Sequence, residues 1–97
     1  MTYELFIDSL QNSHPPEGLS VFLQSLWYDG KGDWHKAHSL VDSLPGSDAA
    51  HVHAYLHRKE GDLGNAGYWY RRANQSRPNV ELEQEWQDLV RKFIKSR

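Results

Sequence analysis

The chain has 97 residues, a net charge of −2 and no cysteine, which fits one small domain and excludes disulfides and thiolate metal sites. Its four Trp, five Tyr and three Phe supply apolar surface for a core. No apolar run reaches the roughly 20 residues of a membrane span, and no strongly basic stretch of the kind that binds nucleic acids is present. The acidic first turn does not fit a secretory signal, so we expect a cytoplasmic protein that binds neither membranes nor nucleic acids.

Six helices and no strands are predicted. A first helix over about residues 3–10 ends at the Pro-containing segment 12–16. Two helix hairpins follow, the first over about 17–44 and the second over about 48–75. A last helix over about 80–96 has an apolar stripe at helical spacing and a charged opposite face, which is typical of a capping helix. We expect all six helices to form one domain.

An internal repeat underlies the two hairpins. The pattern Gly-Asp-x-x-x-Ala occurs twice, 29 residues apart. Its residues are Gly32, Asp33 and Ala37 in the first copy and Gly61, Asp62 and Ala66 in the second. In each copy we expect the Gly to end one helix in the left-handed conformation and the Asp to cap the next helix. The Ala then lets the two helices approach closely.

The second helix of the second hairpin combines large and very small residues. We expect Trp69 to pack against the last helix near Trp86. Gly64 and Gly67 each cost about 1 kcal/mol relative to Ala inside a helix, and close approach of that last helix is the simplest reason for them.

The second hairpin resembles a tetratricopeptide repeat. The positions that match the small, aromatic and terminal-proline positions of that repeat are Gly61, Ala66, Tyr70, Ala73 and Pro78. His53 and His57 stand where Leu and Tyr are usual. The resemblance implies an all-α, tetratricopeptide-like superhelix, with the two hairpins between an N-terminal and a C-terminal capping helix. The segments 26–34, 53–62 and 66–73 also look like a family of short bacterial and fungal proteins of uncharacterised function, which implies the same fold and no activity.

Charge is distributed unevenly along the chain. Residues 1–50 carry two Lys and seven acids, a net −5, whereas residues 51–78 carry five basic residues and two acids, a net +3. In tetratricopeptide domains the first helix of each hairpin lines a concave groove. Carried onto this chain, the groove residues of the second hairpin are His51, Tyr55, Arg58 and Lys59. They suit a small anionic ligand or a peptide terminus. The alternative is a solvated helix face in which Arg58 pairs with an acid from the first half of the chain.

Histidines form the second candidate site. Spacings of i, i+4 and i+7 place three possible metal ligands on one helical face: His53, His57 and Glu60. The preceding helix carries a similar set: His35, His38 and Asp42. Two such faces turned toward each other would suit Zn, Ni or Fe(II). The alternatives are that His53 and His57 are neutral packing residues with hydrogen-bonded rings, or that they contact a ligand or respond to pH.

Function is predicted from these two sites. Nucleophile elbows, phosphate-binding loops and dinucleotide motifs are absent from the sequence, which favours a non-catalytic protein. We therefore expect a binding or adaptor module that recognises an anionic ligand or a peptide through the second hairpin and needs no cofactor. The alternative is a small metal-dependent enzyme or metal sensor that uses His53, His57 and Glu60. Self-association through an exposed hairpin face is a third hypothesis.

Overall fold

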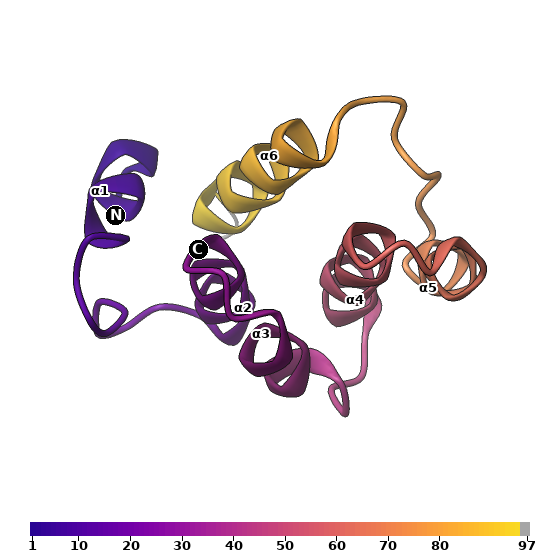
Figure 1. Cartoon of the computed structure of the whole chain (residues 1–97), viewed down its shortest axis with the longest axis horizontal. Helices are drawn as coiled ribbons and strands as arrows, with labels where there is room; N and C mark the ends of the chain where they lie inside the picture. The colour runs from indigo at the N-terminus through magenta and orange to yellow at the C-terminus, as the bar shows by residue number, and fades with distance from the viewer. Residues whose placement is uncertain (96–97) are drawn as a thin grey trace.

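The computed structural model describes residues 1–95, and these residues form six α-helices and no strand (Figure 1). The helices are α1 (Tyr3–Ser9), α2 (Val21–Gly30), α3 (Trp34–Val41), α4 (Ser47–Lys59), α5 (Leu63–Arg72) and α6 (Leu82–Lys95). The prediction of a small all-α protein is confirmed. Residue 96, at the end of the predicted capping helix, lies outside the described residues. None of the helices within residues 1–95 is both long and apolar enough to cross a membrane. The cytoplasmic setting stays a prediction.

The helices α2 and α3, and likewise α4 and α5, pair as hairpins. Their turns have the geometry that the repeated pattern predicts. Gly32 and Gly61 both have a φ of +87°, a left-handed conformation that a side chain would strain. Asp33 and Asp62 each accept a hydrogen bond from the backbone N–H three residues further on, which caps α3 and α5. The two alanines of the pattern are fully buried, as expected for close helix contact.

The last helix, α6, packs on α1, α2 and α4, and its contact with α5 is made by side chains (Figure 1). Its buried apolar residues are Leu89, Val90 and Phe93. The indole of Trp86 donates a hydrogen bond of 3.0 Å to the carbonyl oxygen of Leu26 in α2. The prediction that Trp69 packs near Trp86 is wrong. Trp69 instead stacks on His53 of α4, with ring centroids 4.0 Å apart.

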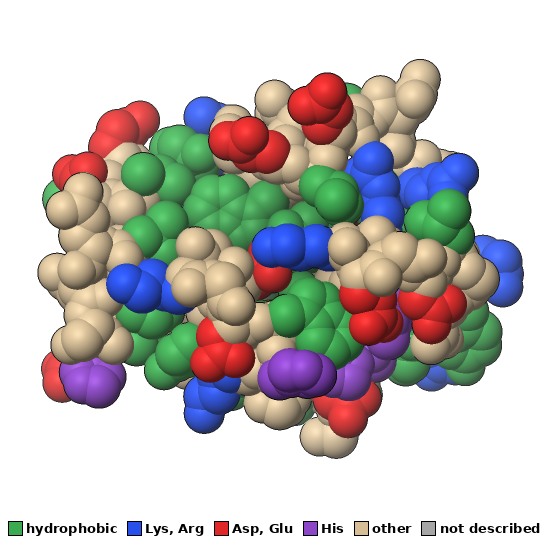
Figure 2. Space-filling view, viewed as in Figure 1, with side chains coloured by type: hydrophobic (Ala, Val, Ile, Leu, Met, Phe, Trp, Pro, Cys, Tyr) green, Lys and Arg blue, Asp and Glu red, His purple; other side chains and the backbone are tan. Residues whose placement is uncertain are grey.

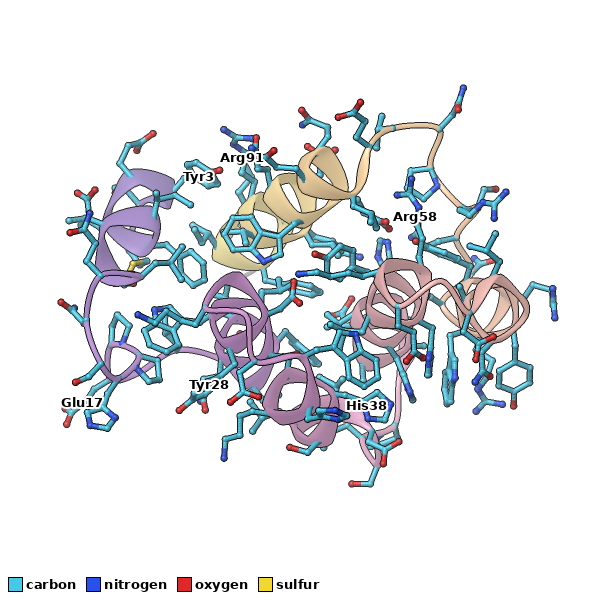
Figure 3. All side chains as sticks on the ribbon, in the orientation of Figure 1. Tyr3, Glu17, Tyr28, His38, Arg58 and Arg91 are labelled. Carbon is cyan, nitrogen blue, oxygen red and sulfur yellow. The ribbon has the colours of Figure 1, made fainter. Side chains whose placement is uncertain are left out.

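A buried carboxylate of α6 forms hydrogen bonds with two side chains of the second hairpin. Glu85, only 3% exposed, accepts a hydrogen bond of 2.8 Å from Arg58 and one of 2.5 Å from the Tyr70 hydroxyl. Arg58 reaches from α4 toward the segment that leads into α6, where it also donates to the carbonyl oxygen of Val80 (Figure 3). Burial, together with the bond to Glu85, raises the pKa of Tyr70 well above its usual range, so this hydroxyl stays protonated and donates.

The two glycines of α5 are not explained by close approach of α6, and that prediction is also wrong. A Cβ atom on Gly64 would meet no other atom within 4 Å, and one on Gly67 would meet only the guanidinium of Arg71, at 3.5 Å. The helix α5 lies at one end of the molecule, and its backbone does not approach that of α6 (Figure 1). Within residues 1–95, therefore, no packing contact requires glycine at either position.

Substitution of Gly67 by Ala should raise the free energy of unfolding by about 0.5–1 kcal/mol, because Ala loses less backbone entropy in a helix interior and its methyl group has room. Urea denaturation followed by circular dichroism measures this change. Gly61→Ala is the matched control and should be destabilising, because φ there is +87°. A loss of stability in Gly67→Ala would contradict the free space around this residue.

Candidate metal centre

Two of the four residues predicted to bind an anion, Tyr55 and Lys59, lie together beside α6. Tyr55 is 2% exposed, and its hydroxyl donates a hydrogen bond of 2.7 Å to the carboxylate of Asp29. The ammonium of Lys59 pairs with the same carboxylate at 2.9 Å. Both side chains border a hollow of about 350 Å³ next to Trp86. The acidic first half of the chain therefore neutralises Lys59 internally.

The other two residues of that set are separated from this hollow. His51, nearer the start of α4, accepts a hydrogen bond of 3.0 Å from Lys92 of α6 and borders a different hollow. Arg58 is paired with Glu85, so its acidic partner comes from α6 and not from the first half of the chain. The structure thus divides His51, Tyr55, Arg58 and Lys59 between two hollows and one buried ion pair.

Three histidines from α3 and α4 converge at a different place. His38 of α3 and His53 and His57 of α4 bring ring nitrogens within 4.8 Å of one another. The Nε2 atoms of His38 and His53 are 2.9 Å apart, so one of these rings donates a hydrogen bond to the other. The rings of His53 and His57, one helical turn apart, stack with centroids 4.7 Å apart. Histidine side chains gather at the lower right of the face in Figure 2, and Figure 3 labels His38 there.

Two carboxylates border this histidine cluster. An oxygen of Asp42 lies 3.8 Å from Nε2 of His38 and 3.9 Å from Nε2 of His53. Glu60 bonds instead to Nδ1 of His57, at 2.6 Å. Because Glu60 engages Nδ1, the other ring nitrogen of His57 is the one left for the cluster. A carboxylate that orients a histidine in this way is common among metal-binding histidines.

Two tryptophan rings pack against the histidine cluster, one on His38 and one on His53. Trp34 stacks on His38 with ring centroids 4.9 Å apart. The indole N–H of Trp34 donates a hydrogen bond of 2.8 Å to the carbonyl oxygen of Leu56. Trp69 covers His53 in the same manner. The side chains of His53 and His57 are 4% and 10% exposed, against 22% for His38. Solvent and solutes therefore reach the cluster from the side of His38 and the exposed Asp42.

Electrostatics keep the central ring uncharged. The pKa of His53 is lowered to about 4, first by burial and then by the neighbouring His38 and His57, while Asp42 acts in the opposite direction. At neutral pH this imidazole is therefore neutral and offers a nitrogen lone pair without first losing a proton.

The sequence analysis assigned one set of possible metal ligands to each of two neighbouring helices. In the structure, two members of each set lie close together. The residues that meet are His38, Asp42, His53 and His57. His35 stays exposed, and of these groups Glu60 reaches only His57. The two tryptophan contacts were not predicted. Trp34 lies four residues before His38 on one helix, a spacing that could have indicated contact, whereas the partner of Trp69 depended on tertiary packing.

Comparisons of the chain with protein-family models, with curated proteins and with solved structures find no match.

Proposed function

We propose that this chain is a small, non-catalytic metal-binding protein that holds a divalent transition metal between α3 and α4. The observation that carries the proposal is the convergence of three histidine ring nitrogens from two helices, with Asp42 at the open edge. Imidazole nitrogens with one carboxylate oxygen suit Zn, Ni or Fe(II). An ion there links the first hairpin to the second, so its binding free energy adds to that of folding.

The nitrogen spacing supports this proposal. Two nitrogens each about 2.1 Å from one ion are roughly 3.0 Å apart at a right-angled site and roughly 3.4 Å apart at a tetrahedral one. The Nε2 atoms of His38 and His53 are 2.9 Å apart. This separation is close to that of two ligands on one ion, and both rings must turn from each other toward the ion when it binds.

The anionic-ligand hypothesis on His51, Tyr55, Arg58 and Lys59 receives less support. Its two strongest cations, Arg58 and Lys59, already have carboxylate partners, and a ligand would compete with Glu85 and Asp29 for them. The metal proposal requires no such competition, because a metal replaces the hydrogen bond between His38 and His53.

A titration with metal tests the proposal. Protein without a histidine tag should bind one Ni, Zn or Fe(II) ion per chain, measured by calorimetry. At a free metal concentration of about 100 times Kd, the gain is about 2.7 kcal/mol, which raises the melting temperature by about 10 °C or more. Lack of both stoichiometric binding and a thermal shift would rule the metal site out.

Two variants locate the ion. His38→Asn, at the accessible edge, should remove the thermal shift while leaving the metal-free fold intact by circular dichroism. His35→Asn changes an exposed histidine of the same helix and should keep the full shift. Equal loss of binding in both variants would show adventitious binding by surface histidines.

We further infer that the two hairpins are shortened tetratricopeptide-like units. Support comes from the equal φ of Gly32 and Gly61, from the two aspartate caps and from the buried alanines. In this arrangement α6 occupies the inner side that a longer array would keep for a peptide, and the metal site lies between successive units. Self-association, for which α5 offers an exposed face, stays a hypothesis for light scattering to test.

A further inference from the structure

A hollow of about 380 Å³ adjoins the histidine cluster. It lies between α5 and the connection from α3 to α4, and its lining includes Asp42, Ser43, Ala50, Trp69 and Arg72. Two of these residues also belong to the surroundings of the cluster: Asp42 faces two of the histidines, and Trp69 stacks on His53. The hollow therefore borders the proposed metal site at Asp42 and Trp69.

Arg72 lines the same hollow as Asp42 and is a cation with free donors. Its guanidinium lies 5.5 Å from the ring centroid of Trp69 and 5.7 Å from that of Tyr68, whose hydroxyl accepts its one hydrogen bond, at 3.3 Å. Within the described part of the chain, no carboxylate lies within 4.0 Å of Arg72. Most of the five N–H groups of this fork thus remain available to an anion.

The two ends of the hollow are close enough for one small ligand. Trp69 lies directly against both His53 and Arg72, which places the guanidinium less than about 10 Å from the His53 ring. The rest of the lining is mixed, with the apolar Leu44, Pro45 and Ala50 beside the polar Ser43 and Ser47. A ligand that fits has an oxygen anion at each end and a short carbon chain between them.

We propose that the metal-loaded protein binds a short dicarboxylate, one carboxylate on the ion and the other on Arg72. This inference rests on the proposed metal site and adds the class of ligand that the site recognises. Asp42, with a side chain 59% exposed, is the group that the incoming carboxylate joins or replaces at the metal. A compact anion such as inorganic phosphate reaches one end only.

Calorimetry with succinate tests this inference on protein that has been loaded with Ni and freed of excess metal. Succinate should bind the loaded protein and not the metal-free protein, and acetate and inorganic phosphate should each bind at least tenfold more weakly. Arg72→Ala should weaken succinate binding about tenfold or more without changing the metal affinity. Arg71→Ala, the exposed neighbour, should match the unmodified protein.

Three outcomes would overturn the inference while the metal site stands: no succinate binding by the loaded protein, equal binding of acetate or phosphate, or unchanged succinate binding in Arg72→Ala. Failure of the protein to take up metal at all appears in the loading step. That result would contradict both the proposed metal site and the dicarboxylate inference that depends on it.

Discussion

Replacement of Glu85 by Ala should lower the free energy of unfolding by about 3–5 kcal/mol, because the substitution leaves the Arg58 charge and the Tyr70 hydroxyl without their buried acceptor. Domains of this size have only about 5–15 kcal/mol of stability, so the variant should melt at a much lower temperature. Urea denaturation followed by tryptophan fluorescence measures the change. The expected loss exceeds that of a surface ion pair because Glu85 is 3% exposed.

Glu83→Ala is the matched control, since Glu83 is an exposed carboxylate in the same first turn of α6. It should lose less than about 1 kcal/mol. A double-mutant cycle of Glu85→Ala with Arg58→Met should give a coupling energy of about 1–3 kcal/mol. Similar stability of the Glu83 and Glu85 variants would show that the buried ion pair does not hold α6 in place.

Acid should destabilise the metal-free protein through two histidines of α4, His51 and His53. The pKa of His53 is lowered from 6.5 to about 4 in the folded chain. Above pH 6.5 the ring is neutral in both states, and as pH falls from 6.5 to 4 only the unfolded chain takes up the proton. Stability is therefore lost across this window, by about 3 kcal/mol for His53 alone. His51, whose pKa burial and Lys92 also lower to about 4, contributes with the same sign.

Urea denaturation of metal-free protein at pH 7 and pH 4 measures this dependence. His53→Leu introduces an apolar side chain of similar size that has no titrating group. The difference in stability between the two pH values should shrink by about 3 kcal/mol in this variant. In His14→Asn, where the histidine is exposed, the difference should stay unchanged. Equal pH dependence in both variants would contradict the assignment to His53.

Local features of the fold followed from the sequence. The turns formed as predicted because the left-handed backbone of Gly61 and the cap made by Asp62 depend on neighbouring residues only. The same holds for the alignment of His53 and His57, since helical spacing alone puts them on one face. The repeat of this hairpin pattern also indicated two similar units.

Tertiary structure decided which surfaces those units bury. The amphipathic pattern of α6 required one buried face but did not specify its partner, because any apolar surface meets that requirement equally well. When α6 packs on α2 and α4, Arg58 forms an ion pair with Glu85, and Trp69 stacks on His53 instead of contacting α6. The sequence alone determined two capped hairpins with histidines in packing positions. Only the packing of α3 against α4 determined that His38 meets them, because contacts between helices depend on the whole core.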